Sequence, residues 1–151
     1  MKKAFKIIVG IVLLFGLIQL IPVDKLNPLD VQGQSFVEAY SPPVAVQKIL
    51  EQSCYDCHSN HTQYPSYANI APISWVVRNH VKKGRRYLNL SEWGSYNIYQ
   101  KESLIKKIPQ SILYRKMPLP LYLSYHPQAE LSEEQIQVLV DYFEQLDPNE
   151  L

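Results

Sequence analysis

The sequence contains 151 residues, of which 46% are hydrophobic, and it carries a formal net charge of +1. This length is sufficient for one domain with a hydrophobic core. The near-neutral charge gives no indication of a nucleic-acid partner, and the chain contains no Ser/His/Asp triad pattern, phosphate-binding loop or paired-carboxylate acid and base. Basic residues gather between Arg78 and Lys116 and acidic residues after Ala129, and we interpret most of the basic ones as a solvated face.

The N-terminal stretch combines positive charge with an apolar run. Lys2, Lys3 and Lys6 precede apolar residues that continue over 7–21 with few interruptions, and no small-residue cleavage site follows. The run has about the ~17–25 residues that a helix needs to span a bilayer. We therefore predict a signal anchor over residues 1–21, a transmembrane helix that binds the inner membrane and leaves the exported remainder facing the periplasm. A cleaved signal peptide is the alternative interpretation.

Residues 22–41 show little periodicity and contain Pro22, Pro28 and Gly33. This composition is typical of a connecting segment. We predict a linker that holds the next unit, a domain over residues 42–151, away from the membrane.

A helix is predicted from Pro42 onward, because proline is tolerated in the first turn of a helix. Its apolar spacing continues to Cys54 and Cys57, so the helix ends in the sequence Cys54-Tyr55-Asp56-Cys57-His58. Two thiols at this spacing can form thioethers with the two vinyl groups of one haem, and the adjacent imidazole can bind the iron. We predict one covalently bound haem c, attached at Cys54 and Cys57, with His58 as the proximal iron ligand.

Two other uses of the cysteine pair have less support in the sequence. A redox dithiol of the thioredoxin type requires a βαβ pattern around the pair, and none is visible. A zinc site commonly requires a second pair of ligands, and no second cysteine pair is present although His61 is nearby.

Three further helices are expected after the cysteine motif. One covers residues 72–83 with Gly84 as its stop, and the next covers residues 101–113 with a break or kink at Pro109. The last begins after Ser132, which opens a capping box. No alternating strand pattern of useful length is present, so the predicted fold class is all-α.

The iron has a sixth coordination position, for which the sequence offers two candidates. Met117 lies in a loop with Pro118 and Pro120, and a thioether ligand suits low-spin iron and raises its reduction potential. Because rigid prolines lower the entropy cost of presenting this weak ligand, we predict Met117 as the distal ligand, with a core-filling methionine as the alternative. His80 is the rival ligand, since it lies on the apolar stripe of the helix over residues 72–83; otherwise it is a core histidine or a propionate donor.

Several further side chains suit a haem pocket. Aromatic side chains can pack on the porphyrin or donate a hydrogen bond to a propionate, and a guanidinium matches carboxylate geometry. Ordinary core packing of the aromatic residues and solvent exposure of the arginine are the alternatives. The candidates are Tyr64, Tyr67, Trp75, Arg85 and Trp93.

Three of these features together resemble a class I cytochrome c. They are the helix that ends in Cys54–Asn60, the Met117-Pro118 loop, and the start of the closing helix at Leu131–Glu134. More narrowly, the chain resembles small exported bacterial proteins of the haem-binding domain family, over about Val44 to Leu146. Further motifs of that resemblance are Tyr64-Pro65 and residues 70–75, 80–85 and 88–93. The resemblance implies a cytochrome c-like helical domain around one haem.

These features predict a membrane-anchored monohaem c-type cytochrome that transfers single electrons to or from an unknown redox partner protein. The protein would supply axial ligands, burial and hydrogen bonds, whereas the redox chemistry belongs to the iron. If both axial positions are filled, no open site remains for a substrate, so an electron carrier is expected rather than an enzyme. The alternative is a haem-based peroxidase or a gas or redox sensor with a labile distal ligand.

Overall fold

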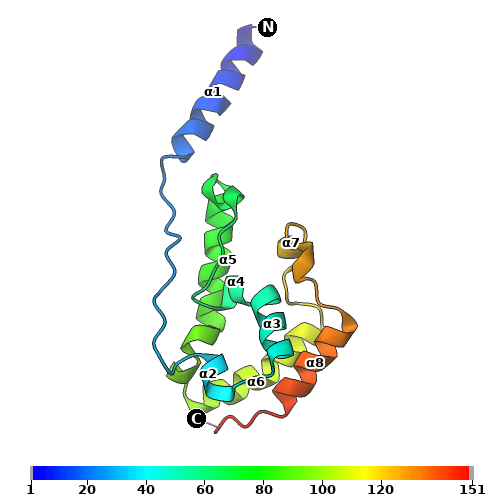
Figure 1. Ribbon diagram of the computed structural model, residues 1–151. Helices are drawn as coiled ribbons and strands as arrows, with labels where there is room; N and C mark the ends of the chain where they lie inside the picture. The colour runs from blue at the N-terminus through cyan, green and yellow to red at the C-terminus, as the bar shows by residue number, and fades with distance from the viewer. Residues whose placement is uncertain (1, 150–151) are drawn as a thin grey trace.

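The computed structural model describes residues 2–149, and all of the regular elements in this range are helices (Figure 1). The predicted all-α class is therefore confirmed for these residues. The elements in chain order are α1 (Lys2–Ile18), α2 (Phe36–Tyr40), α3 (Val44–Ser53), α4 (Tyr55–His58), η1 (Ser66–Asn69), α5 (Ile73–Tyr87), η2 (Leu90–Ser95), α6 (Ile98–Leu113), α7 (Pro120–Leu123), η3 (Pro127–Ala129) and α8 (Glu133–Glu144).

The N-terminal helix α1 corrects the prediction of a transmembrane signal anchor, which is wrong. Among the described residues, no helix is long and apolar enough to cross a membrane. Helix α1 contains 17 residues. At ~1.5 Å per residue it is about 26 Å long, shorter than the ~30 Å hydrocarbon core of a bilayer. It ends at Ile18, and the next side chain, Gln19, accepts from the N–H of Ala71 at 2.9 Å and donates to the carbonyl of Ala71 at 3.1 Å.

Residues 22–41, predicted as a linker, follow the surface of the domain and contribute to its core. Asn27 donates from Nδ2 to the carbonyl oxygen of Thr62 at 3.0 Å. Helix α2 begins at a capping box opened by Ser35, and it places Phe36 in the core with 0% of its surface exposed. The folded unit therefore includes part of this segment. In Figure 1 the segment runs beside α5, whereas α1 projects away from the other helices.

The core lies between α2, α3, η2, α6 and α8 and is rich in aromatic rings. The ring of Phe36 lies 5.0 Å from Trp93 in a T-shaped arrangement and 5.4 Å from Phe143 in a stacked one. Such pairs add to the stabilisation that burial provides. Aliphatic side chains complete this core: Val46, Ile49, Leu50, Leu90, Ile105, Ile112, Leu131, Ile136, Leu139 and Val140.

The helix boundaries agree with the sequence pattern at some ends and differ at others. Helix α8 begins after Ser132, whose side chain forms the predicted capping box. Helix α6 begins at Ile98, earlier than predicted, and continues through Pro109. Helix α5 continues past Gly84 to Tyr87.

Candidate functional site

The motif Cys54-Tyr55-Asp56-Cys57-His58 occupies a tight junction between two helices. Helix α3 ends at Ser53, Cys54 departs from helical geometry with a φ of −122°, and α4 then covers Tyr55–His58. The N–H of His58 donates to the carbonyl oxygen of Cys54 at 2.9 Å. The two thiols and the imidazole therefore come from one turn of the chain, which is the compact arrangement that attachment to a single cofactor requires.

The thiols of Cys54 and Cys57 are half-buried, and neither is in a disulfide. Burial raises the pKa of Cys54 to about 12 and that of Cys57 to about 11. Catalytic dithiols depend on a lowered pKa, which supplies the reactive thiolate, so this pair lacks the electrostatics of a redox dithiol. Among residues 2–149, no three His, Cys, Asp or Glu side chains form a cluster that could hold a metal ion, so His61 does not join the cysteines in one.

The imidazole of His58 is held in one tautomer by the C-terminal end of α5. Its Nδ1 lies 3.1 Å from the carbonyl oxygen of Gly84 and 3.1 Å from that of Leu88. Because a carbonyl oxygen only accepts, Nδ1 carries the proton and Nε2 keeps its lone pair for a metal. Burial lowers the pKa of His58, against the opposing effect of these hydrogen bonds, and so favours the neutral form that binds metals.

Gly84 allows α5 to approach the motif closely. A Cβ atom at this position would overlap the carbonyl oxygen of Cys57 and would lie 3.0 Å from its carbonyl carbon. A larger residue would therefore push α5 away from α4, and with it the carbonyl that binds His58. The prediction of Gly84 as a helix stop is wrong, since α5 continues to Tyr87 and the glycine serves this contact.

Substitution of Gly84 by alanine should destabilise the protein by about 2 kcal/mol, because overpacking at the contact outweighs the gain in helix propensity. Equilibrium unfolding in denaturant measures this loss. Gly16→Ala in α1 is the matched control, since nothing lies within 4 Å of a Cβ at that position. Equal stabilities for Gly84→Ala and the unsubstituted protein would mean that α5 can withdraw from Cys57 without cost.

Arg85, predicted as a propionate partner, binds the loop that follows the motif. Its Nε donates to the carbonyl oxygen of Ser59 at 2.8 Å, and its Nη2 donates to Thr62 Oγ1 at 2.8 Å and to Asn27 Oδ1 at 2.6 Å. The guanidinium thus fastens both this loop and the N-terminal segment to α5. Three such bonds to one planar group fix its orientation.

One candidate for the distal ligand lies on a helix that contacts the motif, and the other lies in the loop before such a helix. His80 lies on α5 one turn before Gly84, and therefore on the same side of the helix. Met117 is three residues before α7, whose Tyr122 hydroxyl donates to Asp56 Oδ2 at 2.7 Å. Since 37% of Met117 is exposed, it does not fill a gap in the core. In Figure 1, α5 and α7 rise on either side of α4.

Apolar side chains on α5 and α7 are exposed to solvent. Ile73 and Val76 of α5 and Leu121 of α7 are the examples. A porphyrin is a large apolar plate, and covering such side chains stabilises its binding. The free thiols, the available Nε2 of His58 and these apolar side chains therefore fit a haem.

The four aromatic candidates lie in different surroundings. Trp93 is buried in the core, as the alternative interpretation expected, and Tyr64 is half-buried. Trp75 is exposed on α5. Tyr67 contacts the segment after α7, where its hydroxyl lies 2.7 Å from Nε2 of His126. His126 was not a predicted site residue, because its only local sequence feature is the proline that follows it.

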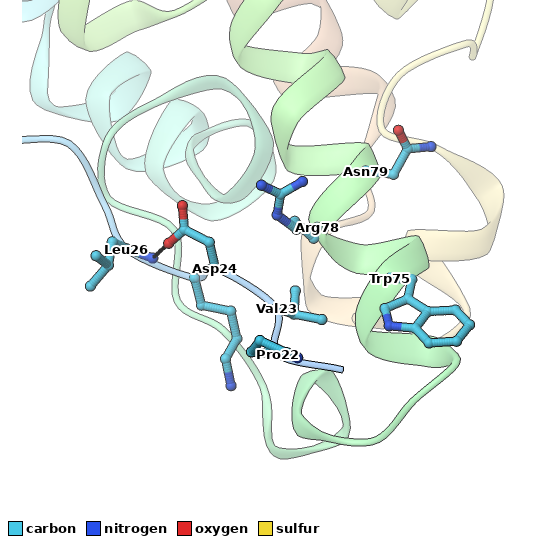
Figure 2. Close-up of a pocket in the computed structure, with 8 residues that line it drawn as sticks. Pro22, Val23, Asp24, Leu26, Trp75, Arg78 and Asn79 are labelled. Atoms are coloured by element: carbon cyan, nitrogen blue, oxygen red, sulfur yellow. Dashed lines mark hydrogen bonds between the residues drawn. The ribbon is translucent and has the colours of Figure 1, made fainter. Parts of the chain in front are cut away.

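An open pocket with a volume of about 1010 Å³ lies beside α5. Figure 2 shows its lining, which comes from residues 22–26 and from Trp75, Arg78 and Asn79 of α5. At ~3.6 residues per turn, Trp75 and Gly84 are about two and a half turns apart and point to opposite sides of the helix. The pocket is therefore separate from the surface of α5 that contacts the cysteine motif.

Comparison with known proteins agrees with this chemistry. A family model described as a haem-binding domain matches residues 13–145. The match begins within α1 and extends beyond the end of α8, so it includes the cysteine motif and Met117. Searches of curated proteins and of solved structures found no match.

Proposed function

The chain belongs to the haem-binding domain family, and on this basis we propose that it is a monohaem c-type cytochrome that transfers single electrons. Cys54 and Cys57 attach the haem through thioethers, and His58 is the proximal iron ligand. Haem binding follows from the family itself. The covalent attachment, the single haem and the electron transfer are the steps that this proposal adds.

The tautomer of His58 is the observation that carries the proposal. Its Nδ1–H is bound by the carbonyls of Gly84 and Leu88, at 3.1 Å each, which directs the free Nε2 away from α5. Metal-binding histidines in proteins are commonly oriented in this way by a backbone carbonyl. His58 directly follows Cys57 in the sequence. The position of the iron ligand is therefore fixed relative to the two thiols that would attach the haem.

The residues of the chain have separate tasks in this function. The thiols of Cys54 and Cys57 would hold the haem covalently, since an S–H group can add across a vinyl group without an external oxidant. The carbonyls of Gly84 and Leu88 orient His58. The bound haem supplies a one-electron couple at its iron. Met117 would be the second protein ligand of the iron, and a thioether there would raise the reduction potential and leave no iron position for a substrate.

We also propose that the protein is exported to the periplasm. Three lysines followed by an apolar stretch are typical of export signals. An oxidising compartment would otherwise favour a disulfide between two neighbouring free thiols, and attachment to haem removes both from that chemistry. Fractionation of cells that express the full chain tests this part, with haem-stained protein expected in the periplasmic fraction.

The distal ligand can be identified by substitution. Met117→Ala should convert the iron from low spin to high spin, lower its reduction potential and remove the sulfur-to-iron charge-transfer band. His80→Ala, a substitution on the rival candidate, should leave all three unchanged. Visible spectroscopy of the haem-loaded proteins and potentiometric titration measure these properties.

If His80→Ala changed these three properties and Met117→Ala left them unchanged, His80 would be the ligand and Met117 would be excluded.

Electron transfer itself is tested by voltammetry of the unsubstituted protein, where we expect one reversible one-electron wave. A high-spin reduced spectrum that shifts when carbon monoxide is added would contradict a filled sixth position and favour a ligand-binding haem protein.

A further inference from the structure

Asp56 lies inside the cysteine motif, and its carboxylate binds two groups outside it. The hydroxyl of Tyr122 donates to Oδ2 at 2.7 Å, and the backbone N–H of Gln63 donates to Oδ1 at 3.0 Å. A carboxylate that accepts on both oxygens has a fixed orientation, and a hydroxyl bond to a charged acceptor is among the stronger ones. Asp56 therefore joins the attachment motif to α7 at a point between the two thiols.

Tyr122 is held on its other side as well. Its ring stacks on that of His126 with centroids 4.3 Å apart and an interplanar angle of 12°. Nε2 of His126 in turn lies 2.7 Å from the hydroxyl of Tyr67 in η1. Burial and the bond to Asp56 raise the pKa of Tyr122 well above its ordinary value, so its hydroxyl keeps the proton that it donates.

The short segment between Met117 and Tyr122 limits where the thioether of Met117 can lie once Tyr122 is bound to Asp56. Pro118 and Pro120 fix two of the backbone φ angles in the connection, and Pro120 is the first residue of α7. On the other side, the N–H of Met117 donates to the carbonyl oxygen of Ser111 at 3.2 Å. Few torsions are therefore free between the methionine and the tyrosine that binds Asp56.

We propose that Asp56 and Tyr122 are positioning residues for the distal iron ligand. Their hydrogen bond sets the location of Met117 relative to the cysteines that hold the haem. The motif thus carries an attachment function and, through its central acidic residue, a second function in distal ligation. This inference rests on the proposed function, since it requires a haem at Cys54 and Cys57.

Tyr122→Phe is the primary test, because it removes one hydroxyl and keeps the ring that stacks on His126. With the bond lost, the population of iron without Met117 should rise about tenfold, as expected from loss of one hydrogen bond to a charged acceptor. The readouts are the intensity of the sulfur-to-iron charge-transfer band and the rate of carbon monoxide binding to reduced protein. Tyr125→Phe is the matched control. Tyr125 is 64% exposed, and its hydroxyl forms no hydrogen bond with any of the described residues.

Asp56→Asn provides a second variant, and the double substitution completes a thermodynamic cycle. If the two residues act through one bond, the double variant should weaken distal ligation no more than Tyr122→Phe alone. Helix content and haem stain after denaturation should remain as in the unsubstituted protein, which separates positioning from folding or attachment. An additive effect of the two substitutions would overturn the inference.

The test also separates this inference from the function on which it rests. An unsubstituted protein without the charge-transfer band would overturn Met117 ligation, and the positioning role with it. A protein that shows the band and keeps it fully in Tyr122→Phe would overturn the positioning role alone.

Discussion

Replacement of Cys54 and Cys57 together by serine should abolish retention of haem under denaturing conditions. A hydroxyl occupies nearly the same space as a thiol but does not form the thioether that survives denaturation. Haem stain of the protein on a denaturing gel measures the effect. Ser53→Ala is the matched control, because it alters the neighbouring residue, whose buried hydroxyl has no hydrogen-bond partner among the described residues.

Each single serine variant should keep one thioether and a weaker stain. Stain that is undiminished in the double variant would show that the haem is held elsewhere on the chain. Stain that is lost equally in Ser53→Ala would show that the loss reflects misfolding of the turn and not the missing sulfur atoms.

Phe36→Ala should lower the free energy of unfolding by about 3–5 kcal/mol, the range for deletion of a buried phenylalanine ring. The side chain is 0% exposed and packs against Trp93 and Phe143. Denaturant unfolding followed by circular dichroism measures the loss. Phe5→Ala in α1 is the control, since 68% of Phe5 is exposed, and a surface substitution of this kind changes stability by about 0.5 kcal/mol at most.

This experiment decides whether the segment before α3 belongs to the folded domain. If Phe36→Ala were as stable as the Phe5→Ala control, residues 22–41 would be a linker after all. A stability loss without loss of haem stain is the expected combination, because Phe36 lies in the core and the cysteines lie at the α3–α4 junction.

The parts of the fold that could be predicted are those with local signals. The start of α8 can be predicted from a capping box, in which the side chains of Ser132 and Gln135 each accept a hydrogen bond from the backbone N–H of the other residue. The cysteine motif is equally local, since the spacing of its thiols and imidazole is itself the chemical requirement. The apolar composition of residues 7–21 predicts a helix, but it does not show that Gln19, directly after the end of α1 at Ile18, binds Ala71 far along the chain.

The parts that could not be predicted depend on tertiary contacts. Gly84 has the sequence context of a helix stop, and only the approach of Cys57 shows why a glycine is needed inside α5. Arg85 has the chemistry of a propionate partner, yet its bonds go to Ser59, Thr62 and Asn27. Phe36 lies in a segment with little periodicity, where no pattern distinguishes a buried ring from an exposed one.

Covalent attachment of one haem is tested most directly by the intact mass of the denatured, unsubstituted protein after expression in bacteria that attach haem to exported proteins. We predict the mass of the polypeptide plus one haem, since addition of two thiols to two vinyl groups releases no atoms. Digestion should place this added mass on the peptide that contains Cys54 and Cys57. The mass of the polypeptide alone, with haem released by the denaturant, would contradict the central claim.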